Sequence, residues 1–495
     1  MAEIDANKDY YEILGVSQSA SDAEIRRAYR SMARQTHPDS RTEKAPTSLF
    51  HDVQEAYAVL SDKNLRRAYD RQRGDAGLDE DSAFFWDISL SRSQLSAQHD
   101  EQMLYALLEI KPGMTTEGER LPLNLCLVVD CSTSMQGARL EHVKGAAHQI
   151  IDELHEDDAL AVVTFNDRAQ VVLPSQVGIN RVRAKTTVST IWASGGTEIL
   201  KGLQIGLAEV EKHHGSQVTS HIILLTDGQT YGDDDECIAE ARQAGARRIG
   251  ITAMGIGEDW NDVLLDAIAN QSNGVSAYIA SPGQVRTLLQ QQVRGLGSIF
   301  AHGLTLTPKC AEGVWVESIF RVAPYLDRLT VKGGAIELGS LQADAPMSVV
   351  LELGVGQKTA GDHRLLTLEL KGDVPSVGRR GERLRRDISL TFTPEEASAE
   401  PVPPAILSAL SKITIYRMQE RTWDTLESGD VDGATRQLEM IATRLFDLGE
   451  PRLARAAMLE AGRLSQGATP TSKGRKELKY GTRGLTIAAR RKAND

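Results

Sequence analysis

The segment Leu123–Met135, LNLCLVVDCSTSM, decides the fold of the central part of the chain. Its unbroken apolar run ends in an aspartate, and hydroxyl side chains follow at once. Later apolar runs of similar length are separated by helical stretches; they are ALAVVTF at 159–165, HIILLTD at 221–227, IGITAMGIG at 249–257 and VSAYIAS at 275–281. Continuously apolar strands that alternate with helices are typical of a parallel sheet covered on both faces. We therefore predict a doubly wound α/β domain over residues 121–298.

Oxygen-bearing side chains collect where the strands of this sheet are predicted to end. They are Asp130, Ser132 and Ser134 after the first run, Thr197 before a helix, and Asp227 at the end of HIILLTD. Ligands of open α/β sheets bind beyond the carboxyl ends of the strands, so these groups should meet. Two carboxylates and three hydroxyls form a hard-oxygen set that suits Mg²⁺ or another divalent cation such as Mn²⁺ or Ca²⁺.

The motifs D-x-S-x-S at 130–134, G-G-T at 195–197 and T-D-G at 226–228 resemble those of the von Willebrand factor A domain, a Rossmann-like fold, and of its metal-ion-dependent adhesion site. The resemblance covers residues 121–298. It implies that Ser132, Ser134 and Thr197 coordinate the ion directly, and that Asp130 and Asp227 do so directly or through water. It also implies an open coordination position that accepts a carboxylate from a partner protein.

Two other metal-dependent classes can be compared with the same residues. An EF-hand loop that began at Asp130 would place Met135 where the sharp turn requires glycine, so we reject it. A phosphatase similar to the haloacid-dehalogenase fold would need an acid at Ser132, so this enzyme class is the least favoured alternative. The chain also lacks the G-x-x-x-x-G-K-[ST], G-x-S-x-G, H-E-x-x-H and G-x-G-x-x-G motifs, and we expect no enzymatic activity.

The first 73 residues have a helical pattern. Ser21 and Glu24 have the spacing of a capping box, which starts a helix. Apolar residues occupy one side of that helix, and the opposite side carries four arginines, Arg26, Arg27, Arg30 and Arg34. A second amphipathic helix follows, and the loop between the two contains His37, Pro38 and Asp39.

The segments DYYEILGV, DAEIRRAYRSMARQTHPD and RRAYD, in this order, resemble the J domain of DnaJ-type co-chaperones over residues 8–73, within a module at 1–73. The resemblance implies that the arginine face docks on a DnaK-type chaperone ATPase. It further implies that His37, Pro38 and Asp39 trigger ATP hydrolysis by that partner. The glycine- and phenylalanine-rich linker and the zinc module of full DnaJ proteins are missing, so their mode of client binding does not carry over.

The remaining segments give the other domain boundaries. An acidic linker spans 74–83, and strands at 84–120 and 299–395 alternate apolar and polar residues, which predicts an antiparallel β-sandwich. The arrangement is similar to that of inter-alpha-trypsin-inhibitor-like proteins, and we infer that the α/β domain is inserted into the sandwich. A linker at 396–404 precedes helical hairpins at 405–466. Residues 467–495 are predicted to be a solvated, disordered basic tail.

Charge and composition limit the partners of this 495-residue chain. The net charge of −12 combines +6 over residues 471–495 with −18 elsewhere. Nucleic acid is therefore an unlikely partner except through the tail. No long apolar run or leader pattern is present, so we predict no membrane association and a cytoplasmic location. The four cysteines are scattered and are expected to be reduced thiols.

These features together predict a J-domain co-chaperone. The A domain would capture a protein client through a Mg²⁺-bridged carboxylate, and the J domain would bring the DnaK-type ATPase to it. The alternative is a metal-dependent assembly scaffold whose J domain only remodels the assembly.

Overall fold

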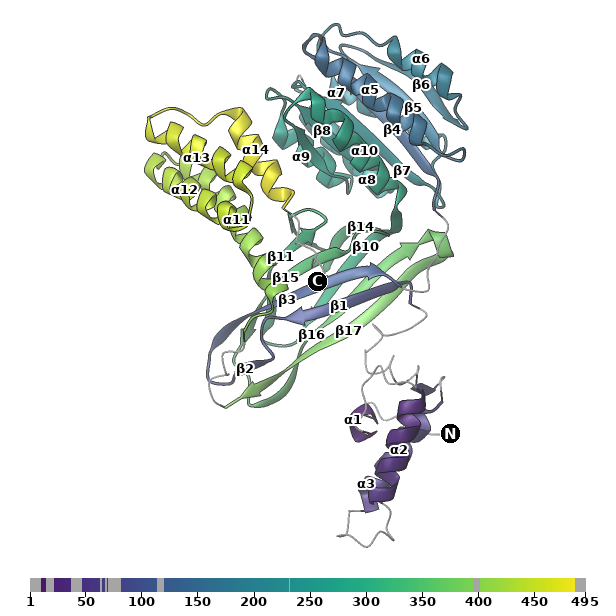
Figure 1. Cartoon of the computed structure of the whole chain (residues 1–495), viewed down its shortest axis with the longest axis vertical. Helices are drawn as coiled ribbons and strands as arrows, with labels where there is room; N and C mark the ends of the chain where they lie inside the picture. The colour runs from purple at the N-terminus through teal and green to yellow at the C-terminus, as the bar shows by residue number, and fades with distance from the viewer. Residues whose placement is uncertain are drawn as a thin grey trace, which may run out of the picture.

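Helical and sheet-forming blocks follow one another along the chain, as Figure 1 shows for the computed structural model of the protein. The structure describes residues 10–14, 22–36, 47–62, 65–66, 69, 82–113, 120–230, 232–394 and 401–485. Within these residues no helix is both long enough and apolar enough to cross a lipid bilayer.

The amino-terminal block is helical throughout its described part. Its helices are α1 (Tyr10–Leu14), α2 (Asp22–Thr36) and α3 (Thr47–Leu60). One side of α2 packs on α3 because its apolar residues recur at helical spacing, and Ile25 and Val53 are fully buried between them. Tyr69 closes the core, where its hydroxyl accepts a hydrogen bond of 2.9 Å from the backbone N–H of Tyr10. The all-α prediction for this module is confirmed.

The central block is a six-stranded sheet in the order β6-β5-β4-β7-β8-β9. Its strands are β4 (Leu123–Asp130), β5 (Ala159–Phe165), β6 (Ala169–Val177), β7 (Thr219–Thr226), β8 (Gly250–Ile256) and β9 (Ser276–Ile279). All of them run parallel except β6, which pairs with β5 in the antiparallel direction. Every residue of β4 is buried, as expected for a strand covered on both faces.

Helices cover both faces of this sheet. They are α5 (Ala138–Glu153), α6 (Arg181–Ser189), α7 (Ile199–Glu211), α8 (Asp234–Ala246), α9 (Asp262–Gln271) and α10 (Val285–Gly297). One apolar core lies under α5, α6 and α10, and a second lies under α7, α8 and α9. Short 3-10 turns occur at Thr133–Met135 and Pro282–Gln284. The structure thus confirms the doubly wound α/β prediction.

Two β-sheets enclose the third core. One has the order β1-β3-β15-β11-β12, and the other has the order β13-β14-β10-β16-β17-β2. Their strands are β1 (Phe84–Leu90), β2 (Gln94–Ser96), β3 (Glu101–Pro112), β10 (Ile299–Cys310), β11 (Val314–Ala323), β12 (Asp327–Leu329), β13 (Val331–Lys332), β14 (Ala335–Gln342), β15 (Met347–Gly356), β16 (Gly361–Val374) and β17 (Arg379–Thr393), with a 3-10 turn at Pro375–Val377.

The strands on either side of the α/β domain share these sheets. β3, which precedes that domain, pairs along its length with β15, which follows it. The α/β domain is therefore inserted into the sandwich. All strand pairs of the two sheets are antiparallel except β2 with β17, and apolar side chains from both sheets form one core.

The carboxyl-terminal block contains α11 (Pro404–Glu427), α12 (Val431–Asp447), α13 (Pro451–Ser465) and α14 (Ser472–Arg483). Gly429 and Gly449 end the first two helices with φ values of 90° and 78°, a conformation that glycine adopts without strain. Helical hairpins were predicted here, and α11, α12 and α13 form them.

The prediction of a disordered tail from residue 467 is wrong over α14. Lys476 is 3% exposed, and its Nζ donates hydrogen bonds to the backbone oxygens of Glu258 and Trp260 at 2.6 and 2.7 Å. Lys476 lies on the packed face of α14 because the α/β domain supplies hydrogen-bond acceptors for its ammonium group. A count of charges along the sequence cannot reveal such acceptors.

Candidate metal centre

The five oxygen-bearing side chains of the predicted metal site lie at one edge of the central sheet. Asp130 ends β4, and Asp227 directly follows β7, which is hydrogen-bonded to β4. Both carboxylates are buried, and so are Ser132 and Thr197, whereas Ser134 is exposed. The site is thus buried at its base and open at Ser134.

Hydrogen bonds hold the Asp130 carboxylate in one orientation. Its Oδ1 accepts the backbone N–H of Ser132 at 2.7 Å, and its Oδ2 accepts the hydroxyl of Thr226 at 2.6 Å. One donor, Ser132, is itself a site residue, and the other, Thr226, immediately precedes Asp227. The two strand ends are therefore tied together through the carboxylate itself.

The hydroxyls link the first motif to Asp227. Ser132 Oγ and Ser134 Oγ lie 2.9 Å apart, and the Ser134 hydroxyl donates to Asp227 Oδ1 at 2.7 Å. Oxygens of three site residues are therefore in direct contact.

The segment before α7 brings Thr197 to the same place. The backbone N–H of Ser194 donates to the oxygen of Cys131 at 2.7 Å, and the carbonyl of Gly195 accepts the backbone N–H and the hydroxyl of Thr133 at 3.1 and 3.0 Å. A Cβ atom at Gly228 would lie 2.9 Å from Thr197 Oγ1, so this hydroxyl packs against the residue that follows Asp227. The structure therefore brings all five predicted residues together.

The electrostatics of the site favour a bound cation. Burial raises the pKa of Asp130 to about 6, although hydrogen bonds from Thr226 and Ser132 act in the opposite direction and the Asp227 charge adds to the rise. Two buried carboxylates close to one another repel unless a positive charge lies between them. The guanidinium of Arg139, which pairs with Asp227, supplies part of that charge, and a divalent ion would supply the rest.

Sequence reasoning missed one charged residue of this site, Arg139. Its Nη1 forms an ion pair with Asp227 Oδ2 and a hydrogen bond of 3.2 Å with the Ser134 carbonyl. Arg139 lies in the first turn of α5, where a positive charge opposes the helix dipole. The one signal of this role in the sequence was the position of Arg139 itself, a basic residue at the start of a helix, where acidic residues are favoured.

The donor set fits a hard divalent ion such as Mg²⁺, Ca²⁺ or Mn²⁺ rather than a soft metal held by His and Cys side chains. Among the described residues, no cluster of three or more His, Cys, Asp or Glu side chains could hold a metal ion. Carboxylate and hydroxyl oxygens with room for water are the ligands that suit Mg²⁺. Ser132, Ser134 and Thr197 would hold the ion together with the two carboxylates.

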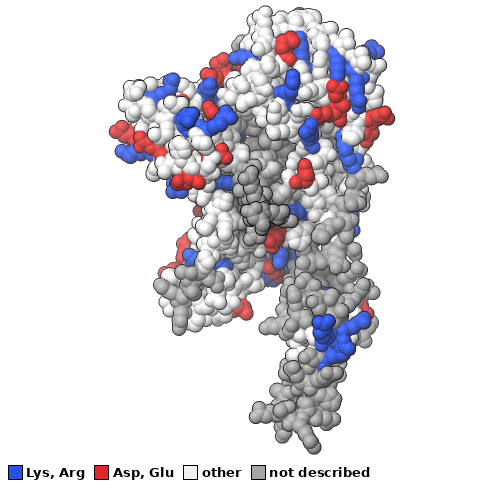
Figure 2. Space-filling view, viewed as in Figure 1, with Lys and Arg blue, Asp and Glu red and all other residues white. Residues whose placement is uncertain are grey.

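The predicted chaperone-binding residues lie partly within the described part of the chain. Arg26, Arg27 and Arg30 are exposed on α2, and Figure 2 shows basic atoms gathered over this helix. Arg34 lies within α2, but its side chain is outside the described residues, as are His37, Pro38 and Asp39 in full. Arg30 Nε donates a hydrogen bond of 3.2 Å to the Arg26 carbonyl one turn earlier in the helix.

Three family models match the chain. A DnaJ domain model matches residues 9–70, a von Willebrand factor type A domain model matches 124–291, and a model described as the Sll0103-like C-terminal alpha-helical domain matches 404–488. The J-domain and von Willebrand factor A resemblances proposed from the sequence are thereby confirmed, over 9–70 and 124–291.

Curated relatives cover different parts of the chain. The uncharacterized protein sll0103 of Synechocystis is 34% identical over 331 residues, which are 65% of this chain and 78% of that protein. The chaperone protein DnaJ of Acholeplasma laidlawii is 51% identical over 76 residues, which are 15% of this chain and 20% of that protein. The likeness to DnaJ is therefore confined to the J domain.

Solved structures share the fold of the larger part. A von Willebrand factor type A protein from Catenulispora acidiphila covers 82% of this chain and 98% of its own, with a TM-score of 0.66 and 18% identity. The ArnB paralog VWA2 from Sulfolobus acidocaldarius also covers 82% of this chain and 100% of its own, with a TM-score of 0.52 and 14% identity. At these identities the likeness concerns the fold alone.

Proposed function

This chain belongs to the family of the Synechocystis protein sll0103 and carries a DnaJ domain, and on that premise we propose that it is a J-domain co-chaperone. Its A domain captures a protein client through a Mg²⁺-bridged carboxylate, and its J domain recruits a DnaK-type ATPase to that client. It works in the cytoplasm and catalyses no covalent reaction itself. The observation that carries the proposal is the convergence of Asp130, Ser132, Ser134, Thr197 and Asp227 on the chain that also holds the J domain.

A DnaJ domain implies a DnaK-type partner in general. Arg26, Arg27 and Arg30 support this role because they are exposed on one face of α2, opposite the buried Ile25. Clustered exposed guanidinium groups raise the association rate with an acidic surface more than they increase the affinity. His37, Pro38 and Asp39 are the residues to which we assign the stimulation of ATP hydrolysis.

We assign client capture to the edge of the central sheet that carries the five site residues, here called the metal edge. This edge combines buried carboxylates with an exposed side chain. Asp130 and Asp227 are buried, whereas Ser134 is exposed and touches Asp227. An ion held by these residues would keep some coordination positions for water, and a client carboxylate could replace one of those waters. Since the J domain is part of the same chain, ATPase recruitment to the captured client is intramolecular and gains effective concentration.

The two halves of the proposal can be tested separately with purified full-length protein. We expect His37→Gln to abolish the stimulation of ATP hydrolysis by a purified DnaK-type chaperone, measured as phosphate release, while client capture on an affinity resin persists. Asp130→Ala, or a chelator, should abolish capture while stimulation persists. A substitution at an exposed position of the neighbouring helix, Gln54→Ala on α3, is the matched control and should leave both properties intact.

Three outcomes would contradict the proposal. If assembly of a large complex requires Asp130 but is indifferent to His37→Gln, the chain is a metal-dependent scaffold. Unchanged capture by Asp130→Ala would remove the metal edge from client binding. Phosphate release from a generic phosphoester by the protein alone would point instead to a Mg²⁺-dependent phosphatase.

A further inference from the structure

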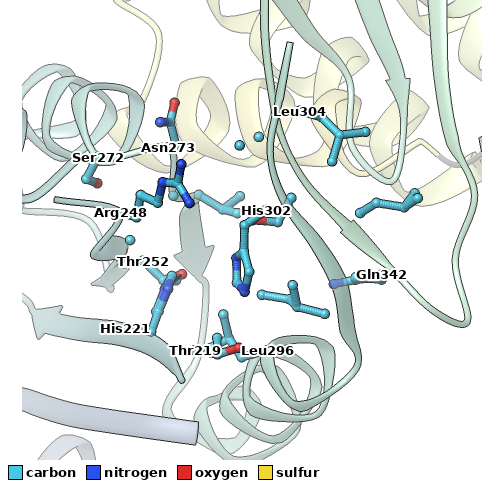
Figure 3. A pocket seen from close by; sticks show the side chains of 18 of the residues that line it. Thr219, His221, Arg248, Thr252, Ser272, Asn273, Leu296, His302, Leu304 and Gln342 are labelled. Carbon is cyan, nitrogen blue, oxygen red and sulfur yellow. Dashed lines mark hydrogen bonds between the residues drawn. The ribbon is translucent and has the colours of Figure 1, made fainter. Parts of the chain in front are cut away.

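The β-sandwich lies against the amino-terminal edge of the central sheet. Figure 3 shows the pocket at this junction, and on the A-domain side it is lined by Thr219 and His221 of β7 and by Thr252 of β8. These residues lie near the amino-terminal ends of the two parallel strands, whereas Asp130 and Asp227 lie at the carboxyl-terminal ends. Within the described residues, the sandwich therefore leaves the metal edge uncovered.

A tryptophan with a largely exposed side chain lies at this uncovered edge. Trp192 is 69% exposed, more than any other tryptophan or phenylalanine in the described part of the chain. Helix α6 begins near the opposite edge, where Arg181 Nη2 donates to the Leu154 carbonyl ahead of β5 at 2.7 Å. Beyond α6, the Ser194 N–H donates to the oxygen of Cys131 at 2.7 Å. The chain thus reaches the D-x-S-x-S motif within two residues of Trp192.

The side chains of this segment alternate between the core and the solvent. Ile191 is buried, and Ala193 packs against the same apolar core under α5, α6 and α10. Trp192 and Ser194 are exposed, so both face away from that core. Since two residues of extended chain span at most about 7 Å, the backbone of Trp192 lies close to the contact between Ser194 and Cys131.

Hydrogen bonds hold the backbone next to Trp192 in place. Asn166 Nδ2 donates to the Ser194 carbonyl at 2.8 Å, and the Gly196 N–H donates to Asp167 Oδ1 at 2.9 Å. Both acceptors and donors belong to the carboxyl-terminal edge of the sheet, because Asn166 and Asp167 directly follow β5. The indole therefore projects from a fixed segment of the metal edge.

Exposure of the Trp192 indole to water is unfavourable unless a partner covers it. Burial of apolar surface is favourable in proportion to its area, and tryptophan is enriched among the residues that dominate binding at protein interfaces. An isolated apolar side chain on a protein surface carries no such meaning. Trp192 differs because it lies on a fixed segment beside the candidate metal centre.

Two kinds of client side chain could cover an indole, a basic one and an apolar one. A basic group is attracted to the face of a tryptophan ring. A divalent ion beside the ring would repel that group, and so would the guanidinium of Arg139, which pairs with Asp227. An apolar side chain avoids this repulsion. The charges of the metal edge therefore favour an apolar contact with Trp192.

We propose that Trp192 contacts the client directly and selects acidic residues that have an apolar side chain next to them. This inference rests on the proposed capture of a client carboxylate at the metal edge. The ion binds the carboxylate, and the indole of Trp192 covers the neighbouring apolar side chain. Carboxylates occur on almost every protein surface, so the ion alone gives little selectivity, and the indole supplies the selectivity that the ion lacks.

Fluorescence anisotropy with the full-length protein in Mg²⁺ tests this role of Trp192. The probes are labelled peptides that each contain one aspartate, flanked by leucines, by glycines or by lysines. We expect the leucine-flanked probe to bind the wild type about tenfold more tightly than the glycine-flanked probe. Trp192→Ala should abolish this difference without weakening the glycine-flanked probe, and Trp192→Phe should keep most of it. Phe446→Ala, at an exposed aromatic position of α12, is the matched control and should keep the full difference.

The outcomes separate this inference from the proposed function. If none of the probes binds at about 1 mM, or if Asp130→Ala binds them as well as the wild type does, metal-bridged capture fails and the inference fails with it. If binding depends on Mg²⁺ and on Asp130 but the wild type does not prefer leucine over glycine, only the inference is overturned. The same holds if the lysine-flanked probe binds most tightly, or if Trp192→Ala and Phe446→Ala behave alike.

Discussion

Arg483 of α14 and Asp266 of α9 form a two-bond ion pair across 217 positions of the chain, with both N–O distances at 2.9 Å. Lys479 Nζ lies 2.9 Å from the same carboxylate, and the Tyr480 hydroxyl donates to it at 2.9 Å. Burial raises the pKa of Asp266, but the charges of Arg483 and Lys479 outweigh burial and hold this pKa below its ordinary value. These contacts hold α14 against the A domain. Figure 1 shows the ribbons of α14 and α9.

Removal of the Asp266 charge should release α14. Asp266→Asn leaves Arg483 and Lys479 close together without their shared partner, and breaking a buried pair costs about 3 kcal/mol. We expect amide hydrogen exchange in α14 to accelerate by about 100-fold, because each 1.4 kcal/mol of local stability changes the opening equilibrium tenfold. The measurement is hydrogen exchange followed by mass spectrometry of the peptides from α14.

The exposed ion pair of Arg294 with Glu153, 3.0 Å long, provides the control. Arg294→Gln removes a similar contact from the surface of the A domain and should leave exchange in α14 unchanged. Equal exchange in Asp266→Asn and the wild type would show that α14 is held by its apolar contacts alone.

The sequence predicted the meeting of the five oxygen-bearing side chains more completely than the contacts between the domains. Asp130 and Asp227 each end an apolar strand, so one topological rule places both at the same edge, and the serines follow at fixed short spacing. Arg139 was missed because residue spacing does not show which distant residue a long side chain can contact, here Asp227. Lys476 was missed because its partners are backbone carbonyls more than 200 positions away, and backbone acceptors have no sequence signature.

Mg²⁺ should stabilise the A domain by binding to the five residues of the candidate metal centre. A ligand that binds only the folded state adds about 2.7 kcal/mol at a concentration 100 times its dissociation constant, and this should raise the Tm of the domain by about 5 °C. Asp130→Ala should abolish the shift. Differential scanning calorimetry with and without Mg²⁺ measures it.

Thr186→Ala is the control for the metal experiment. Its hydroxyl is exposed on α6 and bonds the Val182 carbonyl, away from the metal edge, so the Mg²⁺ shift should persist. A shift of the same size in Asp130→Ala would place the bound ion elsewhere.

Arg139 should compete with the metal ion. Its guanidinium pairs with Asp227, so an incoming cation has to replace it or share that carboxylate. Arg139→Gln removes the competing charge and should increase the Mg²⁺ affinity about tenfold, which corresponds to 1.4 kcal/mol. Isothermal titration with MgCl₂ measures the change. Arg183→Gln, on the exposed side of α6, should leave the affinity as it is, and an unchanged or lower affinity in Arg139→Gln would refute the competition.

Acid should destabilise the A domain through His221. This residue is 7% exposed on β7, its Nε2 lies 2.8 Å from the Thr252 hydroxyl, and burial lowers its pKa to about 3. In the unfolded chain the His221 imidazole binds a proton near pH 6.5, whereas in the folded chain it stays neutral down to about pH 3. The free energy of unfolding is therefore unaffected by this group above about pH 6.5 and declines as the pH falls from 6.5 toward 3.

Between pH 6.5 and 4.5 this imidazole should remove about 2 kcal/mol from the free energy of unfolding, measured by urea denaturation at each pH. His221→Gln cannot titrate but keeps a polar group beside Thr252, so its stability should depend less on pH over this interval. His155→Gln, at an exposed position before β5, should retain the wild-type dependence. If His221→Gln and the wild type lose stability in parallel, the acid sensitivity arises from other groups, and the pKa of the His221 imidazole does not differ between the folded and unfolded chains.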